Sequence, residues 1–95
     1  MRILCDEMLA RVGRWLRIAG YDTEWCEKGT PDERVLARAV TEQRILLSCD
    51  RRFVEIATRE IEAYYQESAE LEVWVPFLEE ALGVDWERAP WSRCI

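Results

Sequence analysis

Three aspartates of this 95-residue chain, Asp6, Asp32 and Asp50, are the side chains best suited to do chemistry together. Carboxylates that converge on one water-accessible point repel one another and raise each other's pKa unless a hard divalent cation neutralises them. A cation held by such oxygen ligands lowers the pKa of a bound water and stabilises the charge that develops on a phosphate. The three aspartates therefore favour hydrolysis of a phosphodiester, with Mg²⁺ or Mn²⁺ as the cofactor.

A second interpretation of the same aspartates is structural. Each one stands at or within the first turn of a predicted helix, where an aspartate caps the backbone and interacts favourably with the helix dipole. The neighbouring Glu7 and Glu33 share this ambiguity, because either one could be a metal ligand or a helix cap. Position along the chain leaves both interpretations open.

The composition excludes several classes of function. Histidine is absent, which excludes Ser–His–Asp triads, zinc sites built on histidine and His-pair ribonuclease chemistry. With 49% hydrophobic and 34% charged residues, the chain is typical of a folded domain with one core. We expect a single domain over residues 1–95, with a core over 1–85 and an irregular tail over 86–95. No apolar run approaches the roughly 20 residues of a membrane span and no export signal is visible, so a cytoplasmic protein without membrane contact is expected.

The net charge is −6, yet most of the arginines lie in the first half of the chain. Arg14 and Arg17 fall on the polar face of the first predicted helix, and Arg51 and Arg52 directly follow Asp50. The guanidinium fork matches the geometry of a phosphate, so these four arginines are candidate substrate contacts. The alternative is an ordinary solvated helix face.

Short apolar runs alternate with longer stretches of helical period, which predicts an α/β fold. Strands joined by helix-length crossovers lie parallel, so we expect a mainly parallel sheet of about four strands with helices on both faces. In the second helix, Thr30 is the expected N-cap and Glu33 its capping-box partner. The expected strands are 2–5, 21–26, 44–49 and an edge-like 71–75; the expected helices are 7–19, one beginning at 30–33, 53–65 and 76–82.

The carboxyl ends of parallel strands share one edge of the sheet, which is where ligands of open α/β folds bind. Asp6 follows the first strand, Asp50 follows the third, and Asp32 lies in the connection that leaves the second. We therefore expect these three side chains at one edge, provided that the first and third strands are parallel neighbours. Asp22 enters the second strand and belongs at the opposite edge.

Over roughly the first 55 residues, the chain resembles the PIN-like Mut-seven C-terminal ribonuclease domains. The resemblance implies a three-layer PIN-like fold, an RNA substrate and a divalent metal held by acidic side chains. It implies Asp6 and Asp50 as the firmest metal ligands, Asp32 as a third, and Ser48 as the hydroxyl that orients Asp50. The matching strings are Asp-x-Met-Leu at 6–9, Arg-Trp-Leu-Arg at 14–17, Gly-Tyr-Asp-Thr at 20–23, Asp-x-x-x-Leu at 32–36 and Arg-Ile-Leu-Leu-Ser-x-Asp at 44–50.

The chain also departs from that family. Members usually continue past a Ser-Arg-Cys element into a C-x-x-C zinc ribbon, whereas the sequence printed here ends at Ile95, so we expect no zinc site and a free Cys94. Cys49 stands where a basic residue often separates the serine from the aspartate, which weakens a phosphate contact. The other cysteines, none in a C-x-x-C pair, are expected to act as small core hydrophobes.

Two other functions compete with a metal-dependent ribonuclease. A degenerate, non-catalytic PIN-like interaction domain is favoured by the acidic second half of the chain. A receiver-like phosphoacceptor module also places an acidic pair after its first strand and an aspartate after its third, but it needs a lysine at the end of a late strand, and Lys28 is the only lysine. Trp86 and Trp91, outside the regular elements, are expected to be exposed and to favour a homo-oligomer. Trp15, Trp25 and Trp74 are expected to pack in or against the core.

Overall fold

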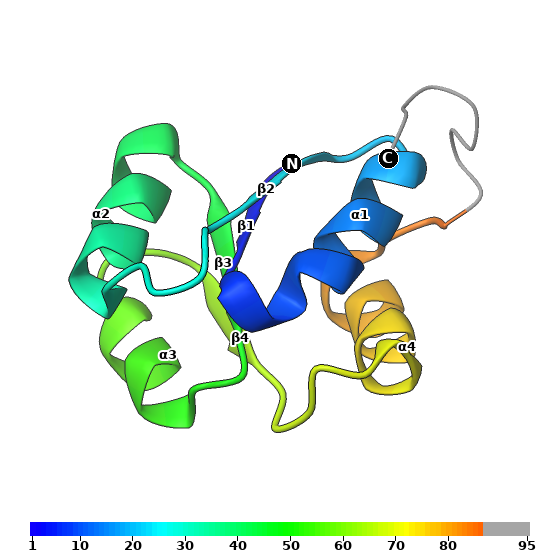
Figure 1. Cartoon of the computed structure of the whole chain (residues 1–95). Helices are drawn as coiled ribbons and strands as arrows, with labels where there is room; N and C mark the ends of the chain where they lie inside the picture. The colour runs from blue at the N-terminus through cyan, green and yellow to red at the C-terminus, as the bar shows by residue number, and fades with distance from the viewer. Residues whose placement is uncertain (87–95) are drawn as a thin grey trace.

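The computed structural model describes residues 1–86 and contains one four-stranded sheet (Figure 1). All three strand pairs are parallel, and the strand order is β2-β1-β3-β4. The first and third strands are therefore parallel neighbours, as the argument from the carboxylates requires. The strands are β1 (Arg2–Cys5), β2 (Asp22–Trp25), β3 (Ile45–Ser48) and β4 (Ala63–Tyr65).

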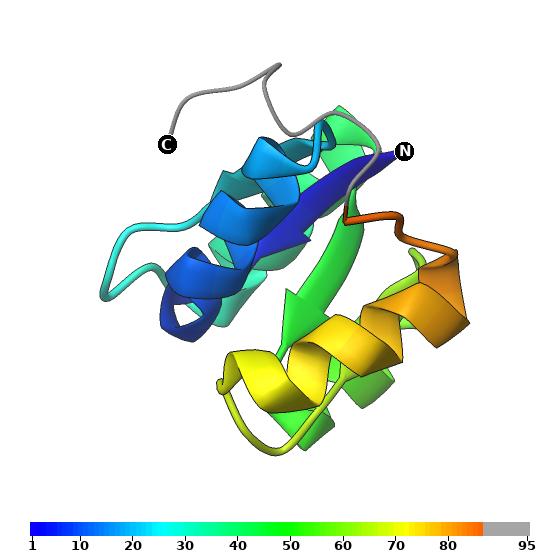
Figure 2. The ribbon, with the colours of Figure 1, turned by 90° about the vertical axis from the view of Figure 1, so that its right-hand side faces the viewer.

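Helices cover both faces of the sheet and complete a three-layer α/β fold, which confirms the predicted class. One face carries the 3₁₀ helix η1 (Glu7–Leu9), α1 (Ala10–Ile18) and α4 (Leu71–Leu82), which Figure 2 shows in front of the strands. The other face carries α2 (Asp32–Glu42) and α3 (Arg51–Ala57). Alternate strand residues serve the two layers: Ile3 and Cys5 are buried beneath α1 and α4, while Leu4 and Leu46 are buried beneath α2 and α3.

Helix α1 approaches β2 closely at a glycine. A Cβ atom on Gly13 would lie 2.7 Å from Cε3 of Trp25, so only glycine lets the indole ring of Trp25 lie against the helix. The same ring contacts two arginines of α1, whose guanidinium carbons lie 4.3 Å (Arg17) and 5.9 Å (Arg14) from its centroid.

The predicted third helix is wrong in its second half. The helix α3 ends at Ala57, and residues 63–65 form β4, which pairs with β3. The apolar period runs on through Ile61 and Tyr64, which is why the sequence predicts one long helix. The backbone N–H groups of both Glu60 and Ile61 donate to the Ala57 carbonyl, so the chain turns there and returns as a strand.

The predicted strand over 71–75 is also wrong, because α4 begins at Leu71 and continues through Pro76. Leu71 and Val75 fit a strand alternation, but Trp74 and Leu78 fit a helical period and are fully buried. The side chains on this stripe pack against the core beside α1. Burial of one continuous helical face overrode the local β propensity.

Three smaller expectations also differ from the structure. The N-cap of α2 is Pro31, and the Thr30 hydroxyl instead donates to the Glu27 carbonyl at 2.6 Å. Trp15 is 47% exposed, whereas Trp74 is buried and Trp25 half-buried as expected. Trp86 is half-buried against the core, not exposed.

The described cysteines lie in or against the core, as expected. Cys5 and Cys26 are buried and Cys49 is half-buried, and burial raises the pKa of all three thiols. Trp91, Cys94 and the rest of the tail beyond Trp86 lie outside the described residues. Within residues 1–86, no helix has both the length and the apolar character to cross a bilayer.

Candidate active site

The ends of β1 and β3 bring two of the predicted aspartates to one point on the sheet edge. Asp6 directly follows β1, and its backbone N–H donates to the Leu47 carbonyl of β3 at 3.0 Å. Asp50 follows β3 by two residues. The chain adds β2 on one side of β1 and then adds β3 and β4 on the other side. The carboxyl ends of β1 and β3 therefore form the topological switch point, which is where open α/β sheets bind ligands.

Ser48, the last residue of β3, connects these two aspartates. It is fully buried, and its hydroxyl donates to Oδ2 of Asp6 at 2.7 Å. The hydroxyl oxygen of Ser48 in turn accepts the backbone N–H of Asp50 at 3.0 Å. Ser48 therefore contacts the backbone of Asp50, while the carboxylate that it orients is that of Asp6.

Helix capping accounts for part of what these aspartates do. Oδ1 of Asp6 accepts the N–H of Met8 at 2.7 Å and caps η1. Oδ1 of Asp50 accepts the N–H of Phe53 at 3.1 Å and caps α3. Asp32 lies inside the first turn of α2, and no hydrogen bond within residues 1–86 uses its carboxylate as a cap. Capping therefore leaves Asp32 and the second oxygen of Asp50 unexplained.

The three carboxylates interact electrostatically. Partial burial raises the pKa of Asp32, and the negative charges of Asp50 and Asp6 raise it further. Smaller contributions of the same sign come from Glu33 and Glu7. The fold thus places negative charge around Asp32 from the connections that follow β1 and β3 and from Glu33 within α2.

The opposite edge of the sheet shows the contrasting arrangement. Nη1 of Arg44 lies 3.0 Å from Oδ1 of Asp22, and Arg2 approaches the other oxygen at 3.4 Å. These arginines lower the pKa of Asp22, the hydrogen bond from Arg44 having the largest effect. Among residues 1–86, no arginine or lysine forms an ion pair with Asp6, Asp32 or Asp50, nor with Glu7 or Glu33.

Two adjoining cavities run along the acidic edge. A small cavity of about 30 Å³ lies between Asp6, Glu7 and Asp32, and the N–H of Gly29 donates to Glu7 at 2.7 Å beside it. A larger cavity of about 340 Å³ begins at Asp32 and Asp50 and opens between α2 and α3. Asp32 lines both, so it stands where the two cavities meet.

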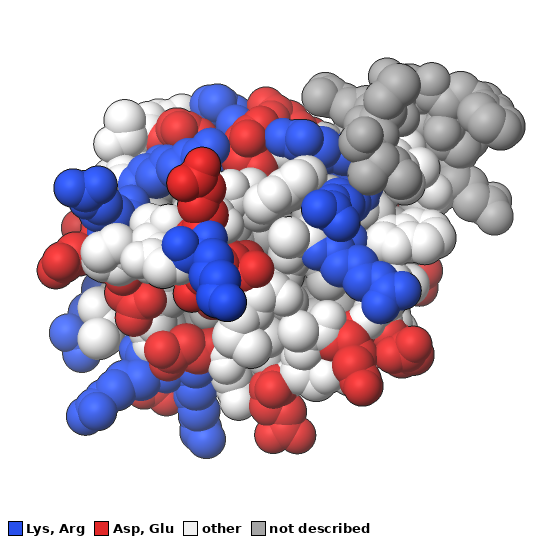
Figure 3. Space-filling view, viewed as in Figure 1, with Lys and Arg blue, Asp and Glu red and all other residues white. Residues whose placement is uncertain are grey.

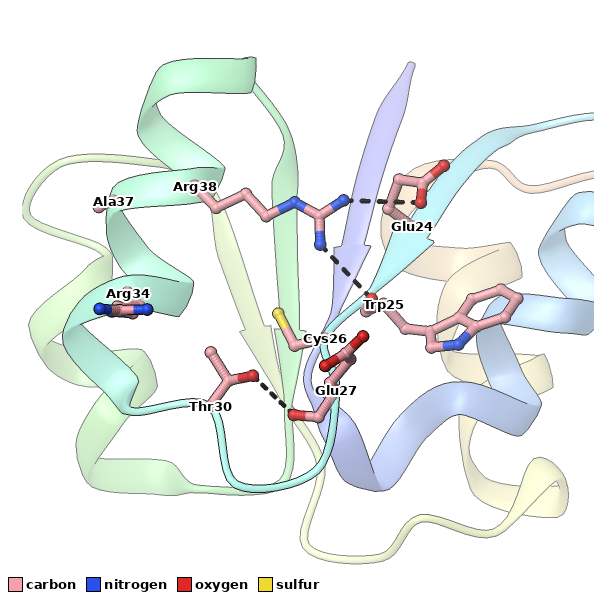
Figure 4. A pocket seen from close by; sticks show the side chains of 8 residues that line it. All are labelled: Glu24, Trp25, Cys26, Glu27, Thr30, Arg34, Ala37 and Arg38. Atoms are coloured by element: carbon pink, nitrogen blue, oxygen red, sulfur yellow. Dashed lines mark hydrogen bonds and ion pairs between the residues drawn. The ribbon is translucent and has the colours of Figure 1, made fainter.

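A third cavity, of about 510 Å³, lies beside the edge strand β2 (Figure 4). Arg38 reaches across it to Glu24 and to the Trp25 carbonyl, and the Trp25 ring points away from it. Arg34 lies at its rim and forms no ion pair within the described part of the chain. The sequence prediction missed Arg34, although its position two residues after Asp32 was a usable signal.

The four predicted substrate arginines divide into two groups. Arg17 is engaged within the fold, because it donates to the Thr23 carbonyl at 2.7 Å and to Glu24 at 2.8 Å. Arg51 lies 3.5 Å from Glu55 in the next turn of α3. Arg14 and Arg52 are exposed and form no ion pair within residues 1–86, and Arg52 lines the cavity that contains Asp32 and Asp50. Basic and acidic side chains are interspersed over much of the face drawn in Figure 3.

The carboxylates do not form a closed metal cage. Among the described residues, no group of three or more Asp, Glu or Cys side chains is close enough to hold an ion. The site is an open acidic edge in which Asp6 and Asp50 are held by hydrogen bonds and Asp32 faces them from α2.

Asp32→Asn is expected to stabilise the fold at pH 7. The pKa of Asp32 is raised in the folded state, so the ionised carboxylate lowers the free energy of unfolding. The uncharged amide of asparagine has no such cost. As the pH falls through that raised pKa, this cost declines, and below about pH 3.9 the unfolded chain is protonated as well and the advantage disappears. Thermal unfolding of both proteins between pH 3 and 8 measures the difference.

Asp22→Asn is the matched control, with the opposite sign. The pKa of Asp22 is lowered, so its charge stabilises the fold above the ordinary aspartate pKa, and this stabilisation is lost as the pH falls through the folded value. The variant is expected to melt below the parent at pH 7. A lower melting temperature for Asp32→Asn at pH 7 would contradict the account of an uncompensated carboxylate.

Comparison with known proteins adds one finding. The family model described as Mut7-C RNAse domain matches residues 1–95, which is the whole chain. No curated protein and no solved structure matches the chain significantly.

Proposed function

The chain belongs to the Mut7-C RNAse domain family, and from this premise we propose that it hydrolyses RNA with Asp6, Asp32 and Asp50 as its catalytic carboxylates and Mg²⁺ or Mn²⁺ as cofactor. One observation carries the proposal. The carboxylates at the carboxyl ends of the strands have no cationic partner within residues 1–86, whereas Asp22 at the opposite edge is paired with two arginines. This contrast between the two edges supports a cation at the edge that carries Asp6, Asp32 and Asp50.

The donor set fits a hard divalent cation. All three side chains offer carboxylate oxygens, and a cation beside Asp32 would offset the burial and the repulsion from Asp50 and Asp6 that together raise its pKa. Mg²⁺ keeps several of its waters and is held in many sites by only one or two carboxylates, so an open edge suits it better than a closed cage. When bound, such an ion lowers the pKa of a coordinated water and stabilises charge on the phosphate.

The protein's own residues would supply position and charge. The Ser48 hydroxyl holds Asp6 in one orientation from a fully buried position. The backbone N–H of Phe53 holds the Asp50 carboxylate by a hydrogen bond at the start of α3. Arg52, which shares a cavity with Asp50 and Asp32, would bind a phosphate oxygen of the substrate strand, and Arg14 on α1 would make a second contact.

The direct test is cleavage of a fluorescently labelled single-stranded RNA with Mg²⁺ or Mn²⁺, compared with the same reaction in excess EDTA. We expect cleavage with either ion and none with EDTA. Cleavage that survives EDTA would contradict the metal-dependent mechanism. Tight Mn²⁺ binding without any cleavage would favour the non-catalytic alternative.

Mn²⁺ is expected to raise the melting temperature of the parent protein. An ion that binds only the folded state adds about 2.7 kcal/mol at a concentration one hundred times its Kd. Asp6→Asn should lose most of this increase, because it removes a charged ligand from the edge. Glu80→Gln, an exposed change on α4, is the matched control and should keep the increase. Equal increases in Asp6→Asn and in the parent would place the ion elsewhere.

The structure disfavours the receiver-like alternative. That module needs a lysine after a late strand, and here β4 is followed by Gln66 and Glu67. Lys28 lies in the exposed connection between β2 and α2. Treatment with a small phosphodonor followed by mass spectrometry should therefore find no phosphate on Asp50.

A further inference from the structure

The larger of the two acidic-edge cavities lies between α2 and α3, and we call it the α2–α3 pocket. Its volume of about 340 Å³ falls at the lower end of the range for small-ligand sites. Asp32 and Asp50 stand at one end of it, so whatever fills the pocket lies next to the proposed point of cleavage. Its lining consists of Asp32, Glu33, Leu36, Asp50, Arg52, Phe53 and Ile56.

One wall of the pocket is apolar. Leu36 comes from α2, and Phe53 and Ile56 come from consecutive turns of α3. Phe53 is buried and fixed in the core, whereas Ile56 is 48% exposed. A flat, weakly polar group lying in the pocket would cover Ile56 and gain the free energy of removing its apolar surface from water.

The charges of the pocket select which part of a nucleotide can occupy it. Three carboxylates and a single guanidinium line it, so the net charge is negative and a phosphate is repelled from the interior. An uncharged base is not repelled. Arg52 forms no ion pair within residues 1–86 and is free to contact the phosphate that follows the base, or to stack on the base itself.

We propose that the α2–α3 pocket binds the base of the RNA nucleotide adjacent to the cleaved bond, and that Glu33 selects bases with an exocyclic amino group. The proposal rests on the proposed ribonuclease function, which assigns Asp32 and Asp50 to the reaction and leaves Glu33 as the carboxylate available to the base. A carboxylate accepts hydrogen bonds, and cytosine N4 and adenine N6 donate them. Uracil has no amino group and presents a carbonyl oxygen at the corresponding position, which a carboxylate repels.

The test uses uncharged nucleosides, which need neither a metal nor cleavage to bind. Adenosine, cytidine and uridine are titrated separately into protein labelled at its isoleucine, leucine and valine methyl groups, and the NMR shifts are followed. We expect saturable shifts at Ile56 and Leu36, with uridine binding at least about fivefold more weakly than cytidine. Val40 on α2 does not line the pocket, is 42% exposed, and should not shift.

Three variants separate the contributions of single residues. Ile56→Ala should weaken cytidine binding by about tenfold, because it removes apolar contact from the pocket. Val40→Ala is its matched control and should bind as the parent does, since both residues are exposed aliphatic side chains on helices of the same layer. Glu33→Gln keeps the size of the side chain but can also donate, so it should abolish the preference for cytidine over uridine.

The outcomes distinguish this inference from the function on which it rests. No saturable shift at Ile56 up to the solubility limit, or an unchanged preference in Glu33→Gln, would overturn the inference even if the protein cleaves RNA. Selective nucleoside binding in a protein that cleaves no RNA would support the base pocket and overturn the ribonuclease assignment. Selective binding together with a matching base preference at the cleaved position would support both.

Discussion

Asp50→Asn is expected to reduce the rate of RNA cleavage by about a hundredfold or more, since losses of single groups at such electrostatic sites are typically that large. The amide removes one negative charge from the acidic edge, which weakens cation binding and the activation of water. Initial rates on a labelled RNA, at equal folded fractions of variant and parent, measure the effect.

The fold should tolerate this substitution. Oδ1 of Asp50 accepts the N–H of Phe53, and the amide oxygen of asparagine can accept the same hydrogen bond, since asparagine is as good an N-cap as aspartate. Asp6→Asn is a less clean test, because both oxygens of Asp6 accept hydrogen bonds, from Met8 and from Ser48, and an amide can replace only one of them.

Glu80→Gln provides the control for a lost surface charge and should cleave RNA at the rate of the parent. Undiminished cleavage by Asp50→Asn with an unchanged melting temperature would mean that Asp50 is only the cap of α3. In that case the catalytic assignment of this edge would fail.

Trp74→Ala is expected to lower the free energy of unfolding by about 3–5 kcal/mol, the usual cost of removing a large aromatic side chain from a core. Trp74 is the largest fully buried side chain within residues 1–86, and its indole N–H donates to the Ser68 carbonyl at 2.7 Å. Its ring also packs edge-on against Phe77 at a centroid distance of 5.7 Å. Urea unfolding of parent and variant measures the loss.

Trp15→Ala is the matched control, because Trp15 is 47% exposed on α1. Its loss should cost within about 0.5 kcal/mol, as is usual for surface changes. The comparison also tests the assignment of residues 71–82 to one helix. If Trp74 lay on an edge strand, as the sequence pattern predicts, the two tryptophans would have similar effects.

From the sequence alone, three of the four strands could be predicted, together with the edge of the sheet to which Asp6, Asp32 and Asp50 belong. Parallel strands need long crossovers, and stretches of helical period supplied them between the first three strands. Once the strands were parallel, Asp6 and Asp50 had to follow the carboxyl ends of β1 and β3, and Asp22 had to lie at the other edge. These conclusions needed only the order of the elements along the chain.

How residues 53–82 divide between helix and strand depends on contacts with the rest of the fold. The apolar spacing around Ile61 and Tyr64 continues a helix, and that around Leu71 and Val75 alternates like a strand. Each pattern also fits the other type of element, because a short apolar run is compatible with both the helical period of 3.6 and the strand period of 2. Residues 63–65 form a strand because they pair with the otherwise unpaired edge of β3. Residues 71–82 form a helix because it buries Trp74 against the sheet face that also carries α1.

The tertiary structure likewise decided which polar side chains are free to act. Arg17 and Arg52 are both candidate substrate contacts in the sequence, but Arg17 lies beside Glu24 and the ring of Trp25, whereas Arg52 lines a cavity. Ser48 lies near Asp50 in the chain and yet donates to Asp6, because β1 is the neighbour of β3. Pairings of this kind depend on contacts between elements far apart in sequence, and no local pattern encodes them.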